Sequence, residues 1–292
     1  MEKIRIITDA ASDISYEDER NLDIKILPFQ VMLGDQSYTS RIDFDNEGFY
    51  ELMAQYDEIP KTSQLTPFEF QELYLKEAQA GYTDLILVLI NSEGSSTYVN
   101  SLMAKELFYD EHPEYKGKVN IYNFDGKGYS SLYGAPVVAA AKMIKEGKGA
   151  EEITAYLKEK LKKRRIYFGM YTLRYAGKSG RIPSAAAFVG DRLNLKPIMK
   201  IYDKYISTAA KIRGEGKLIG KIVDMTLADM EPGSPYEIIY GSDLQARDEM
   251  EAVMRERLGY GPAGYYQISA VIAANAGPRT VGISFDIKEG CR

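Results

Sequence analysis

The sequence predicts a two-domain α/β protein, in which a mostly parallel sheet covered by helices on both faces is followed by a smaller α+β domain. The chain has 292 residues and is 45% hydrophobic, which is enough for two ordinary cores. Short apolar runs alternate with helical patterns through its first half, as in parallel sheets with crossover helices. The unbroken apolar run 85–90 is typical of a strand buried on both faces. We place the boundary near Arg164, giving domains 1–164 and 165–292.

The predicted elements of the first domain follow one another at short intervals. Apolar and β-branched residues gather in five runs that we expect to be strands: 4–8, 24–33, 36–40, 85–90 and 119–124. Helical periodicity predicts helices at 15–21, 46–55, 67–79, 96–108 and 135–147. Thr66, followed by Pro67 and Glu69, has the pattern of a capping box. We therefore assign Thr66 a structural role at the start of the third helix.

The second domain has a different order of elements. A charged helix at 150–164, the last element of the first domain, leads into a strand at 166–172, and a hairpin is expected from 196–203 and 205–212. Three further helices are predicted at 184–195, 218–230 and 244–258. The remaining apolar runs predict strands at 236–241, 268–274 and 282–288. Helices interleaved with strands and a hairpin indicate an α+β domain.

Composition excludes several classes of function. The net charge is −5 and no basic tract is present, so we expect no nucleic-acid partner. The single cysteine, Cys291, cannot form an internal disulfide, which fits a cytoplasmic protein. No apolar run approaches the roughly 18 residues that a membrane span needs, and the N-terminus lacks the apolar stretch of a signal peptide. Transient contact of the protein with a membrane surface is compatible with this sequence.

Catalytic and metal-binding patterns are absent from the sequence. His112 is the only histidine and stands among charged residues before a proline, where a surface position is expected. A Ser-His-Asp triad and a histidine metal site are thereby excluded. The sequence Gly-Lys-Ser at 177–179 lacks the first Walker glycine, because Thr172 occupies that position. We expect no catalytic residue, no metal and no cofactor.

Hydroxyl side chains gather in the loops that follow the predicted strands. Loops after the C-terminal ends of parallel strands face the ligand crevice, and three of them carry the sequences TDAASD, NSEGSST and FDGKGYSS. Capping does not account for Thr62, Ser63 and Ser92, and Ser95 stands near a helix start. Hydroxyls beside free backbone N–H groups can bind an anion such as a carboxylate. The alternative is ordinary turn chemistry, which we consider slightly less favoured.

Seven segments carry a resemblance to a known family: ITDAASD, TSQLTP, NSEGSSTY, TLRYAGKSGRI, LNLKPI, KIRG and NAGPRTVGI. Their order and spacing resemble the DegV family of bacterial fatty-acid-binding proteins, which includes the FakB subunits of fatty acid kinase. The resemblance implies a Rossmann-like α/β domain, a smaller α+β domain and one long-chain fatty acid between them. It also implies a carrier that presents the carboxylate to a partner fatty acid kinase and carries the acyl phosphate onward, without catalysing a reaction itself.

The resemblance also implies the residues that would bind the fatty-acid carboxylate. They are Thr62, Ser63, Ser92 as the first choice in its loop, Ser95 as the second, and Asn275, with Arg213 as a secondary contact. The chain departs from the family at three places: it has Ala10 where a serine is common, Glu93 in the hydroxyl-rich loop, and Asn275 where a histidine is usual. These departures put the head-group contacts, and through them the identity of the ligand, in question.

A second class of function is compatible with the same sequence. Asp9 and Asp125 stand at the C-terminal ends of predicted strands, where a Mg²⁺-dependent phosphotransferase or phosphatase places its carboxylates. Ala11 occupies the position where such a site has its second carboxylate. A carrier needs no metal and turns over no phosphorylated substrate, so the two functions are separable by experiment.

Overall fold

The first half of the chain forms a parallel four-stranded sheet with the order β2-β1-β6-β7. The computed structural model describes residues 2–182 and 195–291. The four strands are β1 (Ile4–Asp9), β2 (Lys25–Leu27), β6 (Asp84–Leu89) and β7 (Asn120–Asp125). Every residue of β6 is buried, as expected for a central strand covered on both faces. The predicted parallel sheet is therefore confirmed.

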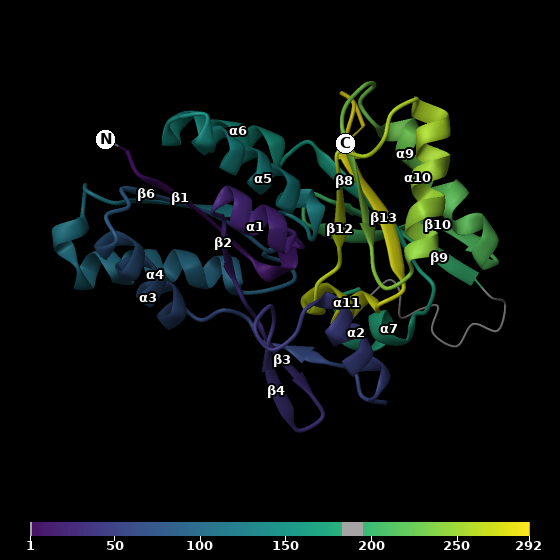
Figure 1. The fold of residues 1–292 in the computed structure, drawn as a ribbon, viewed down its shortest axis with the longest axis horizontal. Coiled ribbons are helices and arrows are strands. Elements are labelled where there is room, and N and C mark those ends of the chain that lie inside the picture. The colour runs from purple at the N-terminus through teal and green to yellow at the C-terminus, as the bar shows by residue number, and fades with distance from the viewer. Residues whose placement is uncertain (1, 183–194, 292) are drawn as a thin grey trace.

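Helices cover both faces of this sheet (Figure 1). One face carries α1 (Tyr16–Leu22), α5 (Ser131–Lys145) and α6 (Ala150–Lys160), and the other carries α3 (Pro67–Gln79) and α4 (Thr97–Glu111). The capping box at Thr66 is formed, since its hydroxyl accepts a hydrogen bond from Glu69 N and the Glu69 carboxylate accepts one from Thr66 N. Ser15 caps α1 in the same way through Asp18 N. Local capping thus fixes where these helices begin.

A small antiparallel sheet, ordered β4-β3-β5, stands beside the parallel one. Its strands are β3 (Gln30–Leu33), β4 (Gln36–Thr39) and β5 (Lys61–Thr62), and α2 (Asn46–Ala54) lies next to it. The expected single strand at 24–33 is wrong: it is divided into β2 and β3 at Pro28, which has no N–H to donate to a sheet. The segment 60–65, which lies outside every predicted helix and strand, contributes the short strand β5.

The second half forms a six-stranded mixed sheet with the order β10-β9-β8-β13-β11-β12. Its strands are β8 (Arg164–Met170), β9 (Leu195–Tyr202), β10 (Tyr205–Arg213), β11 (Tyr236–Tyr240), β12 (Gly264–Gln267) and β13 (Thr280–Asp286). The helices α9 (Leu218–Asp229) and α10 (Leu244–Leu258) cover its outer face (Figure 1). The predicted hairpin is β9 and β10, paired antiparallel.

The expected strand at 268–274 is wrong, because this segment forms the helix α11 (Ala270–Ala276). A short apolar run does not distinguish a strand from a buried helix, and its alanines favour the helix. The strand β12 and the helix α7 (Arg174–Ser179) were not expected, nor were the 3-10 turns at Ala10–Ser12, Pro113–Tyr115 and Glu215–Lys217. The helix expected at 184–195 lies outside the described residues except for its last position.

The apolar core does not divide at residue 164. One cluster contains side chains of the first sheet, such as Ile7 and Leu87, together with side chains of the second, such as Ile166 and Ile239. The helix α5 contacts β1 and β6 as well as β8, β11 and β13. A second cluster fills the space between the outer face of the six-stranded sheet and its helices α9 and α10. The two-domain division therefore stays a prediction.

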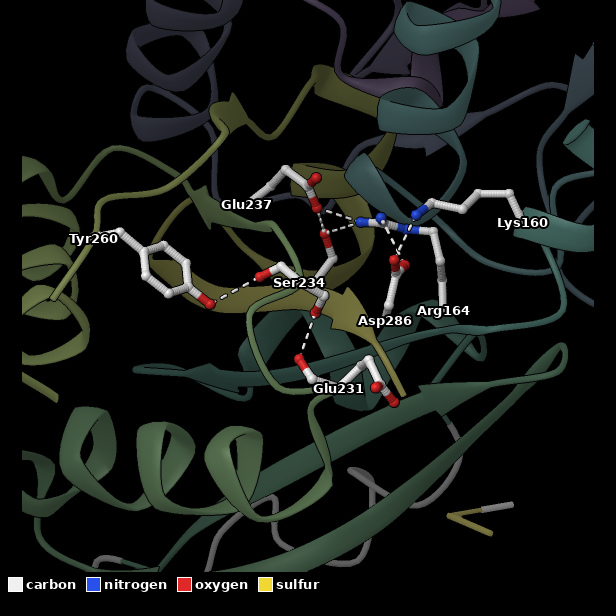
Figure 2. A network of polar contacts seen from close by, with 8 residues as sticks. Lys160, Arg164, Glu231, Ser234, Glu237, Tyr260 and Asp286 are labelled. Carbon is white, nitrogen blue, oxygen red and sulfur yellow. Dashed lines mark hydrogen bonds and ion pairs between the residues drawn. The ribbon is translucent and has the colours of Figure 1, made fainter. Parts of the chain in front are cut away.

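A buried charged network braces the junction between the halves (Figure 2). Arg164, at the start of β8, donates to Glu237 on β11 and to Ser284 on β13, the latter at 2.9 Å. Arg164 also forms an ion pair with Asp286, and Lys160 of α6 forms a second ion pair with the same carboxylate. Burying a charged network of this kind is tolerated only because each charge has a partner.

Candidate functional site

A cavity opens between the two sheets, with about 930 Å³ of empty space, part of it open to solvent. Its walls come from loops of the first half, the inner face of the six-stranded sheet and α11. Within the described part of the chain, no helix has the length and apolar character needed to cross a membrane.

The interior of the cavity is apolar because side chains alternate along the strands. Ile166 and Phe168 of β8 face the cavity, whereas Tyr167 between them packs against the outer helices. Gly282 lies opposite Phe168, and a Cβ added there would lie 2.7 Å from the Phe168 Cβ. The absence of a side chain at this position lets Phe168 lie close against β13. The other apolar side chains of the lining include Phe29, Ile90, Ile182, Ile201, Ile206, Ile239, Ile268, Val271, Ile272 and Ala276.

Polar side chains line another part of the wall, where Thr62, Ser63 and Gln64 follow β5. Pairing with β3 places them, since Thr62 lies opposite Val31 and Ser63 N donates to Gln30 O at 3.0 Å. Ser63 and Gln64 are exposed, which marks this part as the mouth. Neither the Thr62 nor the Ser63 hydroxyl has a hydrogen-bond partner among the described residues. Both hydroxyls are therefore available to a ligand.

Ser95 also lines the cavity, at the start of α4. Its Oγ lies 2.9 Å from Thr97 Oγ1 and accepts a hydrogen bond from Thr97 N at 3.3 Å. Ser95 therefore belongs partly to the turn that begins the helix, yet its oxygen remains at the cavity wall. The neighbouring Gly94 approaches Tyr129 so closely that a Cβ there would lie 2.1 Å from the Tyr129 hydroxyl oxygen.

The structure places Ser92, our first choice in this loop, away from the cavity wall. Its hydroxyl donates to Asp125 at 2.5 Å and accepts from Lys204 Nζ at 3.0 Å. Ser92 is absent from the residues that line the cavity. Ser95, the second choice, is the serine of this loop that lines the cavity, and carboxylate binding by Ser92 stays a prediction. The side chains of adjacent loop positions point in different directions, which sequence spacing does not resolve.

Asn275 lies at the cavity wall, on the last turn of α11. Its Nδ2 donates to Val271 O at 2.8 Å, one turn earlier in the same helix. Arg213, the secondary choice, is exposed at the end of β10 and does not line the cavity. Glu93 is exposed and also lies outside the lining, so its charge does not face the cavity.

Arg181 is a lining residue that the analysis of the sequence missed. It follows α7 within the segment TLRYAGKSGRI, and no carboxylate among the described residues pairs with its guanidinium. An arginine and hydroxyls that have no partner within the described part of the chain make the mouth a suitable site for an anion. The signal in the sequence was its place in TLRYAGKSGRI, one of the seven segments that carry the resemblance.

Two buried aspartates stand behind the cavity. Asp9 accepts hydrogen bonds from Ile90 N and Tyr133 Oη, both at 2.6 Å, and burial raises its pKa to about 6. Asp13 accepts from Ser269 N at 2.8 Å, and burial raises its pKa to about 7. Ser130, which lines the cavity, is buried and has a backbone φ of +55°, an unusual conformation for a residue with a side chain.

These contacts do not favour a phosphotransferase site. Asp9 is fully buried and accepts hydrogen bonds from Ile90 N and Tyr133 Oη. Asp125 accepts a hydrogen bond from Ser92 and forms an ion pair with Lys204 at 2.9 Å. Within residues 2–182 and 195–291, no group of three or more His, Cys, Asp or Glu side chains could hold a metal ion. His112 packs against Phe108 at the far end of α4 from Ser95, and it is half-buried rather than fully exposed.

Curated relatives match almost the whole chain. "Protein DegV" of Bacillus subtilis is 29% identical and covers 98% of this chain and 99% of its own length. A DegV domain-containing protein of Clostridium acetobutylicum is 31% identical, with 97% of this chain and 98% of that protein covered.

Solved structures share the fold over the same length. DegV of Bacillus subtilis, described as a fatty acid binding protein, has a TM-score of 0.83 at 27% identity and covers 99% of this chain and 100% of its own. A stearic acid-binding protein of Eubacterium ventriosum has a TM-score of 0.87 at 22% identity, with 99% of both chains covered. The family model described as "Uncharacterised protein, DegV family" matches residues 3–288. The chain therefore belongs to the DegV family.

Proposed function

We propose that this protein binds one long-chain fatty acid in the cavity between its two sheets. The observation that carries the proposal is the division of the cavity into an apolar interior and a polar mouth, where the Thr62 and Ser63 hydroxyls and the Arg181 guanidinium have no partner among residues 2–182 and 195–291. A fatty acid has the same division, with an apolar chain and a carboxylate. The proposal assigns the carboxylate to Thr62, Ser63, Ser95 and Arg181, with Asn275 beside them.

Two solved relatives support the ligand class. DegV of Bacillus subtilis, at 27% identity, and a DegV family protein of Thermus thermophilus, at 25% identity and a TM-score of 0.84, are both described as binding fatty acids. The proposal extends that property to this chain because its own cavity has the matching chemistry.

The energetics favour tight and durable binding. Burying each methylene is worth about 0.8 kcal/mol, so a chain of about 15 methylenes gives roughly 12 kcal/mol before the costs of association are subtracted. Each charge-assisted hydrogen bond to the carboxylate adds about 1–2 kcal/mol net. A ligand held in this way remains bound through purification.

The protein is proposed to act as a cytoplasmic carrier rather than as an enzyme. In this role it presents the carboxylate to a partner fatty acid kinase and carries the acyl phosphate onward. The exposure of Ser63, Gln64 and Arg181 supports the role, because a carboxylate held at the mouth stays within reach of a second protein.

Mass spectrometry of an organic extract of the purified, folded protein tests the ligand. We expect one long-chain fatty acid in nearly equimolar amount. Folded protein that yields no acyl species and binds no added palmitate contradicts the proposal. Phosphate release from a phosphomonoester in the presence of Mg²⁺ would instead favour the phosphatase function.

Substitutions test the site. The double change Thr62→Ala and Ser95→Ala should weaken palmitate binding by about 2–4 kcal/mol with little loss of stability, because two carboxylate contacts are lost. Thr66→Ala is the matched control: it should lower the free energy of unfolding by about 1 kcal/mol and leave binding unchanged, since Thr66 caps a helix. If Thr66→Ala weakens binding more than the double change does, the site has been misplaced.

A further inference from the structure

The turn of the β9–β10 hairpin is attached to the first sheet at the side of the cavity. The turn consists of Asp203 and Lys204, which both have a positive φ, of 44° and 79°. Residues with side chains seldom adopt this conformation twice in succession unless the surroundings hold it. The backbone of Lys204 is held at both polar atoms, since its N donates to Lys127 O at 3.0 Å and its O accepts from Asn91 Nδ2 at 2.7 Å.

The side chains of the turn add ionic contacts to the backbone ones. Lys204 Nζ lies 2.9 Å from an Asp125 carboxylate oxygen and donates to Ser92 Oγ at 3.0 Å. Ser92 in turn donates to Asp125, so the three groups close a triangle. Lys127 Nζ donates to the carboxylate of Asp203, the other residue of the turn, at 2.6 Å. We name these contacts of Asp203 and Lys204 with Asn91, Ser92, Asp125 and Lys127 the hairpin latch.

The latch stands next to the wall of the cavity. Ile201 and Ile206, which line the cavity, form the second residue pair of the hairpin counted from the turn, after Tyr202 and Tyr205. On the other side of the latch, Asn91 holds the loop that carries Ser95. The backbone O of Asn91 accepts hydrogen bonds from Gly94 N and Ser95 N at 3.0 and 3.1 Å. The latch therefore joins one apolar wall of the cavity to the loop of the polar mouth.

Contacts between the two halves differ in their exposure: Gln267 Nε2 donates to Glu47 at the surface, at 2.6 Å, whereas others are deeply buried. Ser131 on α5 bonds Ser284 on β13 at 2.7 Å, and both residues are fully buried. Ser269 N donates to the buried Asp13. By contrast, the Lys204 side chain is 31% exposed. Ion pairs that reach water are weaker and are screened by salt, so the latch can open while the buried contacts between the halves stay in place.

We propose that the hairpin latch gates the cavity, with Lys204 as the residue that holds it closed over the ligand and positions the Asn91–Ser95 loop. This inference rests on the proposed function, since it concerns how a fatty acid enters and leaves. Opening the latch separates Ile201 and Ile206 from the loop of Ser95 without unfolding either sheet. Ser92 and Asp125 thereby receive a role in ligand exchange rather than in ligand contact.

Dissociation kinetics test the gate. The protein is loaded with cis-parinaric acid, a fluorescent fatty acid, and its release to an excess of phosphatidylcholine vesicles is followed by stopped-flow fluorescence. Lys204→Met should release the probe about three- to tenfold faster than the wild type, the range expected for loss of a part-exposed ion pair and its hydrogen bond. Lys204→Arg should restore most of the slow release because it keeps the charge.

A double-mutant cycle shows whether the contact itself is responsible. Asp125→Asn should accelerate release as Lys204→Met does, and the double variant should be no faster than the faster single variant. Lys148→Met is the matched control, since it removes an exposed ion pair of similar length, Lys148–Glu152 at 2.8 Å, far from the hairpin. It should leave the release rate unchanged.

Salt provides a second readout that needs no substitution. Raising the salt concentration from about 0.01 M to about 1 M shortens the Debye length from about 30 Å to 3 Å, so wild-type release should accelerate. Lys204→Met should lose most of that dependence, and Lys148→Met should keep it. Equal release rates and equal salt dependence in all variants overturn the gate while fatty-acid binding stands. A wild-type protein that binds no fatty acid overturns the proposed function and the gate together.

Discussion

Asp13 is the residue whose environment is most unusual for its type. It is buried behind the cavity with a φ of +54°, and its pKa is raised to about 7, chiefly by burial, although the nearby Ser130 hydroxyl, the hydrogen bond from Ser269 N and the charge of Arg41 oppose the rise. Its carboxylate is therefore protonated in much of the folded protein at neutral pH, whereas an unfolded chain holds it ionised above about pH 4.

This difference gives Asp13 a definite effect on stability. Between about pH 4 and 7 the folded state binds more protons at this group than the unfolded state, so the contribution of Asp13 to stability falls as pH rises. Asp9, whose pKa is raised to about 6, acts in the same direction up to its own pKa. Both groups oppose folding at neutral pH, unlike an aspartate in a salt bridge.

Asp13→Asn should remove the pH dependence that belongs to this residue. Asparagine tolerates a positive φ and can still accept the hydrogen bond from Ser269 N. Relative to wild type, the variant should gain up to about 1 kcal/mol of stability per pH unit between pH 5 and 7, measured by urea unfolding at each pH. A constant difference across that range would show that Asp13 titrates normally.

Residue types predicted the mouth of the cavity better than they predicted individual contacts. Thr62, Ser63, Ser95 and Asn275 lie at the wall. Only Ser95 follows a parallel strand, β6, as expected for loops at strand ends; Thr62 and Ser63 are placed by the antiparallel strand β5 and Asn275 by α11. Ser92 does not line the cavity, and its Oγ accepts a hydrogen bond from Lys204 Nζ of the second half at 3.0 Å. No pattern within the loop itself indicates a contact with a lysine more than a hundred positions away.

At the scale of elements, local signals were sufficient wherever a cap or a long periodic pattern was present. The bounds of α3 and α10 are those expected, and α3 has its capping box. The segment 268–274 was assigned to a strand because a short apolar run suits both a strand and a buried helix, and its alanines favour the helix that forms. The strand β12 was missed because only four residues pair with β11.

The charged network of Arg164 joins three elements of the second sheet, β8, β11 and β13. Arg164→Met should lower the free energy of unfolding by about 3–5 kcal/mol, because it leaves Glu237 buried without its partner. Replacing Glu237 by methionine as well should recover a large part of the loss, since no unpaired charge then remains buried. Urea unfolding of both variants measures the difference.

The exposed pair Lys148–Glu152 is the control for this experiment. Its side chains are about half exposed, so Lys148→Met should change stability by less than about 0.5 kcal/mol. If Arg164→Met were as mild as Lys148→Met, the network would contribute no more than a surface ion pair and would not brace the sheet.

At the scale of the whole molecule, the two halves share one core while the cavity lies between their sheets. The helix α5 packs against strands of both sheets, and the main apolar cluster contains residues from both. The sequence indicated two successive patterns of elements and hence two domains. Sequence patterns do not show whether the apolar faces of the two halves are buried separately or against each other.

This shared core predicts that the protein unfolds as one unit. Urea unfolding followed by far-UV and by near-UV circular dichroism should give coincident transitions, because breaking either sheet exposes the inner face of the other. A fragment of residues 1–164 should fail to fold alone, since it leaves α5 without β8, β11 and β13. Saturating palmitate, at about 100 times its Kd, should stabilise the whole chain by about 2.7 kcal/mol and shift both transitions equally. Two separate transitions, of which only one responds to palmitate, would show that the halves are independent domains and that the ligand belongs to one of them.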